Sequence, residues 1–443
     1  MYITTTLLPE FEMDPQVKYL LSLDAIRDRA KIVGEAAEAG KLSHFDVHEE
    51  KLGAVADYVT GVIKRDYGPD KYGQIPPHGR WQHFEVGSQP RIDDLLLQWN
   101  AEGHDDKELT RRLIDLFFVS VLLDAGAGDH WRYLESGTEQ TFERSEGIAV
   151  ASLYMFKEGA FDSSPDNKMI VDGKGLEQLT SSSLATGFQI SDRNPMLGVE
   201  SRTTLLQSLG TSLLAHPDVF GSEGRPGNIV DHMLKTATNP PALDILVFWD
   251  VLQELLIPIW PRDRTVVKGC PIGDAWPLST LRTASSSTSL PHATDADFIQ
   301  PFHKLTQWLT YSLTVPFTRL LKLTWIHIES MTALPEYRNG GLFVDLDVLS
   351  LKPVSLERGL AASGGALPQF GAGDDAVVEW RAMTLVLIDK LYGMVKERMD
   401  GVELSMAQLL EAGTWKSGRE VAKEKRPKTK SSPILIESDG TVF

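Results

Sequence analysis

The sequence is poor in cysteine, in positive charge and in long hydrophobic runs. Its single cysteine, Cys270, excludes an internal disulfide and a cysteine-based zinc site, and it fits a reducing compartment. The net charge of −17 disfavours binding to nucleic acid or to an anionic membrane, because phosphates would be repelled over most of the surface. The most apolar stretch, ILVFWDVLQELLIPIW, contains Asp250 and Glu254 and is too short and too polar to span a bilayer.

The start of the chain lacks the features of a secretory signal. Met1 is followed by YITTTLLPEFEMD, which has neither a basic start nor an apolar core, and no Asn-x-Ser/Thr sequon occurs in the sequence. We therefore expect a cytoplasmic protein. The mixed basic segment KSGREVAKEKRPKTK near the C-terminus is expected to be solvated surface, although it leaves a nuclear location open.

Several common catalytic motifs are also missing from the sequence. It contains no G-x-S-x-G, no P-loop and no G-x-G-x-x-G after a strand, so a serine nucleophile, NTP hydrolysis and dinucleotide binding have little support. His44 and His48 have a spacing that could bind zinc on a helix, but no third ligand is indicated. We expect a polar helical face there, and we predict no metal and no organic cofactor.

Helical periodicity dominates the chain. It predicts helices over 108–126, over 302–328 with a kink or break at Pro316, and over 376–399 with Asp374 or Asp375 as the cap. Strand-like alternation is limited to 342–352 and the PILIES segment near the end, with extended loop as the alternative for both. The predicted class is mainly α with few short strands. The predicted divisions are an N-terminal extension at 1–14, one helical domain at 15–415 and a C-terminal tail at 416–443.

The segment LLDAGAGDHWRY concentrates polar groups at the end of an apolar helix. Asp124 ends the helix, and after two glycines the chain presents Asp129, His130 and Trp131. A flexible backbone beside an indole and two carboxylates suits a pocket that stacks a flat ligand. The alternative is a helix C-cap followed by a packed tryptophan.

A second polar junction is the segment MTALPEYRNGG. Because Pro335 favours an extended Leu334, Glu336 is expected at or just before the first turn of a short helix, or in a turn. Arg338, two residues later, could converge on the same site. A structural ion pair between Glu336 and Arg338 is the alternative interpretation.

Motifs spread over nearly the whole chain resemble one known family. They are LLDAGAGDHWRY, NPMLGVESRTTLLQSLG, RPGNIVDHML, GDAWPL, LPEYRNGGLFVD and GTWKSGRE with the terminal SDGTVF. This is the fungal and bacterial uracil-catabolism family assigned to the ribosylurea step of the pyrimidine-degrading pathway that does not begin by reducing the ring. The resemblance implies a small substrate derived from a nucleoside or nucleotide, and neither nucleic acid nor membrane as a partner.

The order of the motifs also resembles, more distantly, the queuosine-salvage hydrolases, which cleave an N-glycosidic bond. Those are helical proteins related in fold to helix-hairpin-helix DNA glycosylases, so this likeness implies a similar helical fold. Two departures, Gly-Ala-Gly-Asp-His in the first motif and Ser312 at an acidic position, imply a smaller leaving group than queuine. The motif positions carried over are Asp124, Trp131, His303, Lys304, Gln307, Glu336, Tyr337, Arg338, Glu379 and Arg381.

These resemblances imply hydrolysis of the C1′–N bond of ribosylurea or its 5-phosphate. Glu336 would stabilise the oxocarbenium-like transition state and orient or deprotonate water. The leaving urea needs a proton, and the candidate donors are Asp129, His130 and Asp124.

The other assignments concern substrate binding. Arg338 would keep Glu336 ionised, and a 5-phosphate would bind Lys304 or, as second choice, Arg225 in the Gly-Arg-Pro-Gly turn. The remaining substrate-binding candidates are Trp131, His130, His303, Gln307, Tyr337, Glu379 and Arg381. Two alternatives stay open: a non-catalytic regulator or sensor of uracil catabolism, and an amidohydrolase acting on the urea moiety. The sequence leaves the oligomeric state open.

Overall fold

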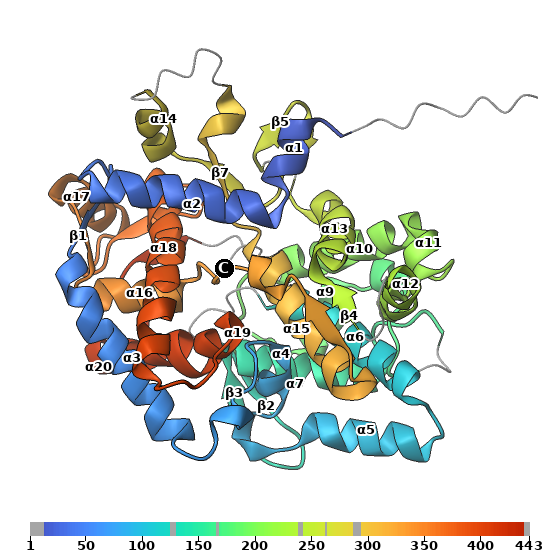
Figure 1. The fold of residues 1–443 in the computed structure, drawn as a ribbon. Helices are drawn as coiled ribbons and strands as arrows, with labels where there is room; N and C mark the ends of the chain where they lie inside the picture. The colour runs from blue at the N-terminus through green and yellow to red at the C-terminus, as the bar shows by residue number, and fades with distance from the viewer. Residues whose placement is uncertain are drawn as a thin grey trace, which may run out of the picture.

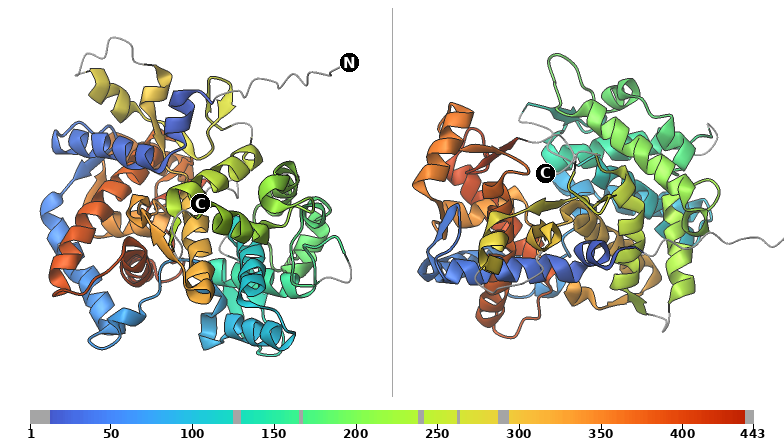
Figure 2. Two further views of the ribbon diagram at one scale, coloured as in Figure 1. Left: turned by 45° about the vertical axis from the view of Figure 1, so that its right-hand side comes forward. Right: turned by 90° about the horizontal axis from the view of Figure 1, so that it is seen from above.

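The computed structural model describes residues 13–124, 130–164, 168–237, 242–261, 264–286 and 294–437. Over these residues helices dominate and strands are short, so the predicted mainly α class is confirmed. Figure 1 shows two groups of helices with α15 (Lys304–Leu321) between them, and the turned view in Figure 2 agrees. None of the described helices is long and apolar enough to cross a membrane.

The first group joins the beginning of the chain to its end. Helices α2 (Leu23–Glu38) and α3 (Leu52–Tyr67) pack on α18 (Asp375–Arg398), and α16 (Tyr337–Asp345) packs on α20 (Trp415–Lys425). The Asp374 side chain caps α18 by accepting a hydrogen bond from the backbone N–H of Ala376, as the sequence predicted. Side chains on all sides of α18 are buried from Ala376 to Leu385, so this part of the helix forms the centre of the group.

The second group contains the middle of the chain. Helix α6 (Asp106–Leu122) packs on α15 and on α7 (Arg144–Lys157), and α10 (Val199–Ala215) packs on α8 (Gly173–Glu177). The remaining α-helices are α1 (Pro15–Leu20), α4 (Arg80–Phe84), α5 (Arg91–Ala101), α9 (Ser181–Gly187), α11 (Pro217–Phe220), α12 (Ile229–Thr236), α13 (Ile245–Leu256), α14 (Ser279–Ser286), α17 (Pro353–Ser363) and α19 (Met406–Leu409).

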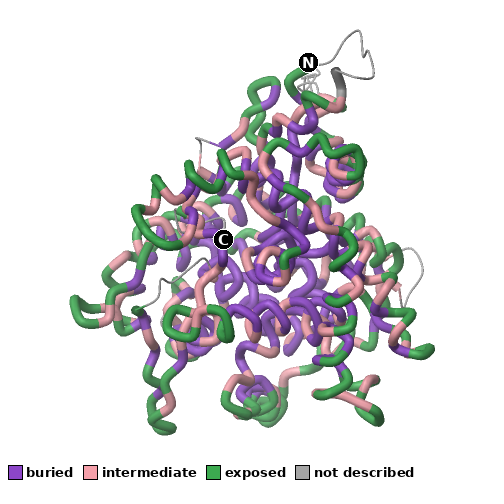
Figure 3. The backbone as a smooth tube through the Cα atoms, turned by 90° about the vertical axis from the view of Figure 1, so that its left-hand side faces the viewer, coloured by how far each residue is buried: buried purple, intermediate pink, exposed green. Residues whose placement is uncertain are grey.

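Helix α15 does not end at Pro316 but continues to Leu321. Of the kink or break predicted at Pro316, the break is therefore wrong. Proline removes one backbone hydrogen bond, but Val315 and Phe317 on either side of it are buried in the core and hold the segment in place. Most buried apolar side chains belong to one continuous core, and Figure 3 shows buried backbone running through the middle of the molecule.

The strands occur as two-stranded pairs, and several of them join distant segments. The pairs among the described residues are β1 (Phe45–Val47) with β10 (Leu349–Leu351), β2 (Arg132–Leu134) with β3 (Thr141–Glu143), β4 (Ala242–Asp244) with β9 (Thr324–Ile326), β5 (Val266–Val267) with β6 (Cys270–Pro271), β7 (Ala275–Pro277) with β8 (Ile299–Pro301), and β11 (Gln369–Gly371) with β12 (Leu435–Glu437).

Two local predictions require correction. The segment predicted as a strand over 342–352 continues α16 to Asp345, and only Leu349–Leu351 is strand. His44 and His48 flank strand β1 and do not lie on a helix. Strand β12, by contrast, lies within PILIES as expected.

The solvated surface predicted for the basic segment 416–430 is only partly observed, because residues 416–422 are buried or half-buried whereas most of 423–430 is exposed. A π-helical turn at Leu410–Thr414 leads into α20, which buries Ser417, Gly418, Val421 and Ala422. Gly418 lies so close to the Arg338 carbonyl of α16 that a side-chain Cβ would have no room. The sequence interpretation missed this amphipathic helix because its exposed face is rich in basic residues. Its small residues permit close packing on α16.

Candidate functional site

Glu336 is the N-cap residue of α16, as the Leu-Pro dipeptide before it predicted. Its carboxylate accepts hydrogen bonds from the backbone N–H groups of Arg338 (2.7 Å) and Asn339 (2.6 Å). The residue is only 9% exposed. Burial raises the pKa of Glu336, whereas these N–H groups and the charges of Lys304 and Arg338 oppose that rise. A buried carboxylate thus lies within electrostatic range of an ammonium group.

Lys304 is the first residue of α15 and is equally buried. Its ammonium makes no hydrogen bond and no ion pair to any described residue, and it lies 5.8 Å from the centroid of the Trp308 ring. Burial lowers the pKa of Lys304, and the negative charges of Glu336 and Asp124 oppose this effect. The ammonium of Lys304 therefore lies within electrostatic range of both carboxylates.

Asp124 follows the C-terminal end of α6 and forms an ion pair with Arg80 of α4. Its carboxylate lies 2.7 Å from the guanidinium, which also binds Ser120 and the Nδ1 of His83. The Arg80 guanidinium is 5.4 Å from the centroid of the Trp308 ring, so this indole contacts two cations. Sequence reasoning missed Arg80 and His83, although Gly-Arg-Trp-Gln-His after a proline pair was an available signal.

Ser312, one of the two departures noted in the sequence, has a structural contact with α4. Its hydroxyl donates to the Trp308 carbonyl (2.8 Å) and accepts from the backbone N–H of Arg80 (3.0 Å). Gly79 permits this contact, because a Cβ there would lie 3.2 Å from the Cα of Ser312. A small serine thus lets α4 approach α15 closely.

Asp274 connects the start of α15, which carries Lys304, to the segment that leads to Glu336. Its carboxylate accepts two hydrogen bonds from Arg381 (2.8 Å each), one from the backbone N–H of Lys304 (3.0 Å) and one from the Trp276 indole (2.7 Å). Although burial acts to raise it, the pKa of Asp274 is held below its usual value by Arg381. Arg381 also donates through Nε to the Pro335 carbonyl at 3.3 Å. This ion pair therefore fixes Lys304 relative to the residue before Glu336.

Two predicted substrate contacts at the start of α15, the N-cap residue His303 and Gln307, have structural partners instead. His303 has a left-handed backbone conformation (φ 44°), and its Nε2 hydrogen-bonds the Leu20 carbonyl at 2.8 Å. The Gln307 amide bonds the Phe302 carbonyl and both the backbone and the hydroxyl of Thr332. Gln307 thereby holds the segment that leads to Glu336 against α15.

Glu379 likewise has a structural role. Its carboxylate accepts hydrogen bonds from the backbone N–H groups of Ser43 (2.8 Å), His44 (2.7 Å) and Phe45 (3.0 Å), and from the Thr280 hydroxyl. These bonds occupy both oxygens. The prediction that Glu379 contacts substrate is therefore not supported, because its acceptors already anchor the loop before β1.

Trp131 packs in the core and is not an open stacking platform. Its indole stacks on Phe188 at 5.6 Å and donates to the Phe188 carbonyl at 2.9 Å, so the alternative of a packed tryptophan is the one observed. His130 is exposed. Asp129 lies outside the described residues.

Arg225 belongs to a separate ion-pair cluster. It binds Asp115 (2.8 Å) and Glu108 (2.9 Å) on the N-terminal and middle parts of α6, whereas Asp124 follows the opposite end of that helix. Its guanidinium nitrogens are therefore occupied by carboxylates. The second-choice assignment of Arg225 to a phosphate is not supported by this geometry.

Tyr337 and Arg338 lie at the edge of the site. The Arg338 guanidinium is 4.9 Å from the centroid of the Tyr337 ring and donates to the Lys430 carbonyl at 2.7 Å. Arg338 is joined to the Glu336 carboxylate through its backbone N–H. The side chains of Glu336 and Arg338 do not form an ion pair, so the structural ion pair considered as the alternative interpretation is not observed.

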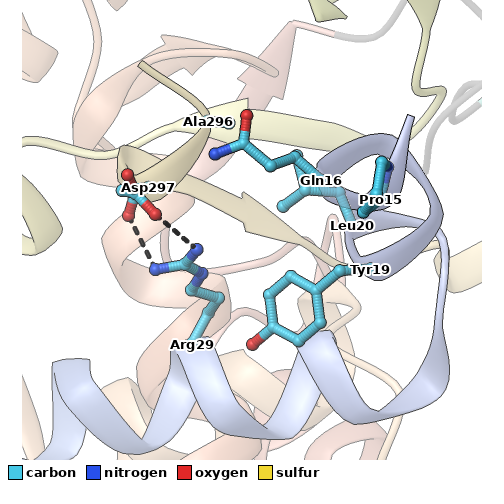
Figure 4. Close-up of a pocket in the computed structure, with 7 residues that line it drawn as sticks. All are labelled: Pro15, Gln16, Tyr19, Leu20, Arg29, Ala296 and Asp297. Carbon is cyan, nitrogen blue, oxygen red and sulfur yellow. Dashed lines mark hydrogen bonds and ion pairs between the residues drawn. The ribbon is translucent and has the colours of Figure 1, made fainter. Parts of the chain in front are cut away.

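A separate hollow of about 390 Å³ lies between α1, α2 and the turn at Asp295–Phe298. Figure 4 shows its polar groups turned to one another: Arg29 binds Asp297, and the Tyr19 ring lies beside the guanidinium. None of the predicted site residues lines this hollow. We place the candidate site at Lys304 and Glu336, since opposite charges are buried together there. No group of three potential metal ligands occurs among the described residues.

Comparisons with known proteins cover nearly the whole chain. The chain is 49% identical over 430 residues to Protein urg3 of Schizosaccharomyces pombe, an alignment covering 96% of this chain and 99% of that protein. It is 44% identical over 445 residues to Uracil catabolism protein 4 of Lachancea kluyveri, covering 97% of this chain and 100% of that protein. Residues 19–443 match the family model described as "Protein of unknown function (DUF1688)". The chain therefore belongs to the DUF1688 family.

Proposed function

We propose that this protein acts in uracil catabolism and hydrolyses the N-ribosyl bond of ribosylurea or its 5-phosphate, releasing urea. The name of the Lachancea kluyveri relative, Uracil catabolism protein 4, supports the pathway. The observation that carries the reaction is the burial of the Glu336 carboxylate at the start of α16 within electrostatic range of the buried Lys304 ammonium at the start of α15.

Glu336 is suited to stabilise positive charge in a sugar. In N-ribosyl hydrolysis the transition state carries positive charge on C1′ and on the ring oxygen, and a fixed carboxylate nearby stabilises it. The backbone N–H groups of Arg338 and Asn339 hold the carboxylate in one orientation, and low exposure reduces screening by water. Glu336 can also accept a proton from the attacking water.

The residues around Glu336 hold its carboxylate in place through hydrogen bonds. Arg381 contacts the Pro335 carbonyl while bound to Asp274, and Gln307 binds Thr332 in the same segment. Because all these groups are buried, the carboxylate cannot move away from Lys304 without breaking several hydrogen bonds. This rigidity favours a preorganised catalytic group.

The test is to give the purified protein ribosylurea and its 5-phosphate and to measure free urea. Wild type should release urea from at least one of them. Glu336→Gln should abolish release, whereas Glu329→Gln, which changes an exposed carboxylate seven residues earlier, should not. Circular dichroism must show both variants folded.

Other results would select the competing functions. A folded wild-type protein that releases no urea from either substrate contradicts the proposal, as does a Glu336→Gln variant as active as wild type. Ammonia and carbon dioxide in place of urea would indicate amide hydrolysis. Tight binding of either compound without turnover would indicate a sensor.

A further inference from the structure

The proposed reaction needs a proton donor for urea, which is a poor leaving group as an anion. Two of the three donors expected from the sequence are poorly placed in the structure. His130 is exposed, and the Asp124 carboxylate is held in a 2.7 Å ion pair with Arg80. The third, Asp129, lies outside the described residues, so among the described residues proton donation requires another acidic group near Glu336.

Lys304 meets this requirement by its position. Its ammonium is buried within electrostatic range of Glu336, and no hydrogen bond to a described residue holds its protons. The other buried cations nearby, Arg80 and Arg381, are fixed in ion pairs, and a guanidinium does not release its proton in proteins. Within the described part of the chain, Lys304 is thus the cation near Glu336 whose protons no hydrogen bond holds.

We propose that Lys304 is the general acid of the reaction and protonates the leaving nitrogen of the urea group. This assignment rests on the proposed function. It replaces the role expected from the sequence, in which Lys304 binds a phosphate. A phosphate at Lys304 would lie within electrostatic range of Glu336 and Asp124, and repulsion by two carboxylates disfavours it.

The proton balance of the step is complete. As the C1′–N bond breaks, its electron pair goes to nitrogen, and a proton from the Lys304 Nζ forms the new N–H bond of urea. Water oxygen bonds to C1′, and the released proton goes to Glu336. Transfer of that proton from Glu336 back to Lys304 restores both groups, so one water is consumed and no other reactant is needed.

The surroundings of Lys304 adjust its acidity in the required direction. Burial lowers its pKa, and Arg381 acts the same way, whereas Glu336, Asp124 and Asp274 oppose them. Its place in the first turn of α15 adds the positive end of the helix dipole, which also disfavours the ammonium. A lysine that is more acidic than in water is a better proton donor near neutral pH.

The decisive experiment compares two leaving groups. Ribosylurea needs a proton on its leaving nitrogen, whereas 4-nitrophenyl β-D-ribofuranoside releases a stable anion without one. Lys304→Arg keeps the positive charge but removes the donor, and Lys304→Met removes both. Each should lower kcat for ribosylurea by ~10²–10⁴-fold and change hydrolysis of the nitrophenyl substrate by less than ~10-fold. Lys322→Arg, at the exposed opposite end of α15, is the matched control.

Specific outcomes would overturn the assignment. Equal losses on both substrates would show that Lys304 is not an acid, and a rise in KM confined to the 5-phosphate would make it a phosphate ligand. If wild type cleaves neither substrate, the proposed function itself fails, and this role with it. An NMR titration of the Lys304 ammonium, assigned with Lys304→Arg, gives a readout independent of turnover. A pKa below ~10.4 is expected, and one at or above it contradicts the proposal.

Discussion

Replacing Asp274 by asparagine should destabilise the protein more than any exposed carboxylate substitution. Each Asp274 oxygen accepts two hydrogen bonds. Oδ1 accepts from the Arg381 guanidinium and the Trp276 indole, and Oδ2 accepts from the Arg381 guanidinium and the backbone N–H of Lys304. An asparagine side chain has one oxygen, so its NH₂ group must face two donors whichever way it turns. The buried guanidinium of Arg381 also loses its counter-charge.

The size of the effect follows from the burial of the pair. Asp274 is 4% exposed and Arg381 is 2% exposed, and removing one partner of such a buried ion pair costs ~3–5 kcal/mol. For 443 residues, an unfolding entropy of ~2.1 cal/mol/K per residue gives about 0.9 kcal/mol/K. Dividing the first figure by the second predicts a fall in Tm of ~3–5 °C.

Differential scanning calorimetry of three variants tests this prediction. Asp274→Asn should show the full shift. Asp295→Asn, whose carboxylate is 97% exposed and 3.6 Å from Arg282, should shift Tm by less than ~1 °C. The double variant Asp274→Asn with Arg381→Met should show a smaller fall in Tm than the sum of the falls in the two single variants, because it leaves no unpaired buried charge.

The dependence on pH has a definite sign. The folded-state pKa of Asp274 is lower than in the unfolded chain, so the ion pair contributes its full stability above the unfolded value of ~3.9. That contribution is lost as pH falls through the lower folded-state pKa, and the gap between wild type and Asp274→Asn should close there. A Tm for Asp274→Asn within 1 °C of wild type at neutral pH would refute the reasoning.

Further predictions concern the packing around the site. Gly418→Ala should lower the free energy of unfolding by ~1–3 kcal/mol, because the added methyl group pushes α20 away from the Arg338 carbonyl. Gly393→Ala, which lies in α18 with open space around it, should raise the free energy of unfolding by ~0.5–1 kcal/mol; urea unfolding measures both changes. Burial holds the pKa of His83 well below 6.5, so unfolding free energy should fall as pH drops below ~6.5, by at most ~1.4 kcal/mol per unit, and His83→Gln should flatten that slope. Trp131→Phe should lower Tm but leave the KM for ribosylurea unchanged, because the indole is a core residue; a raised KM with an intact fold would contradict this.

Sequence by itself determined the helical class and several local features. The 3.6-residue repeat of apolar side chains marked α6, and the paired aspartates marked the start of α18, because both signals arise within one helix. The extended preference imposed by Pro335 placed Glu336 at the start of α16. Such features depend on neighbours a few residues away, and a local pattern is enough to specify them.

Only the tertiary structure decided which of these residues meet. Asp274 binds Arg381 across 107 residues of sequence, and Glu379 anchors a loop more than 330 residues away. Local pattern likewise could not distinguish a tryptophan that stacks a ligand from one that packs on Phe188, as Trp131 does. These contacts depend on how whole helices pack, since burial and charge pairing arise from three-dimensional proximity that short-range periodicity does not encode.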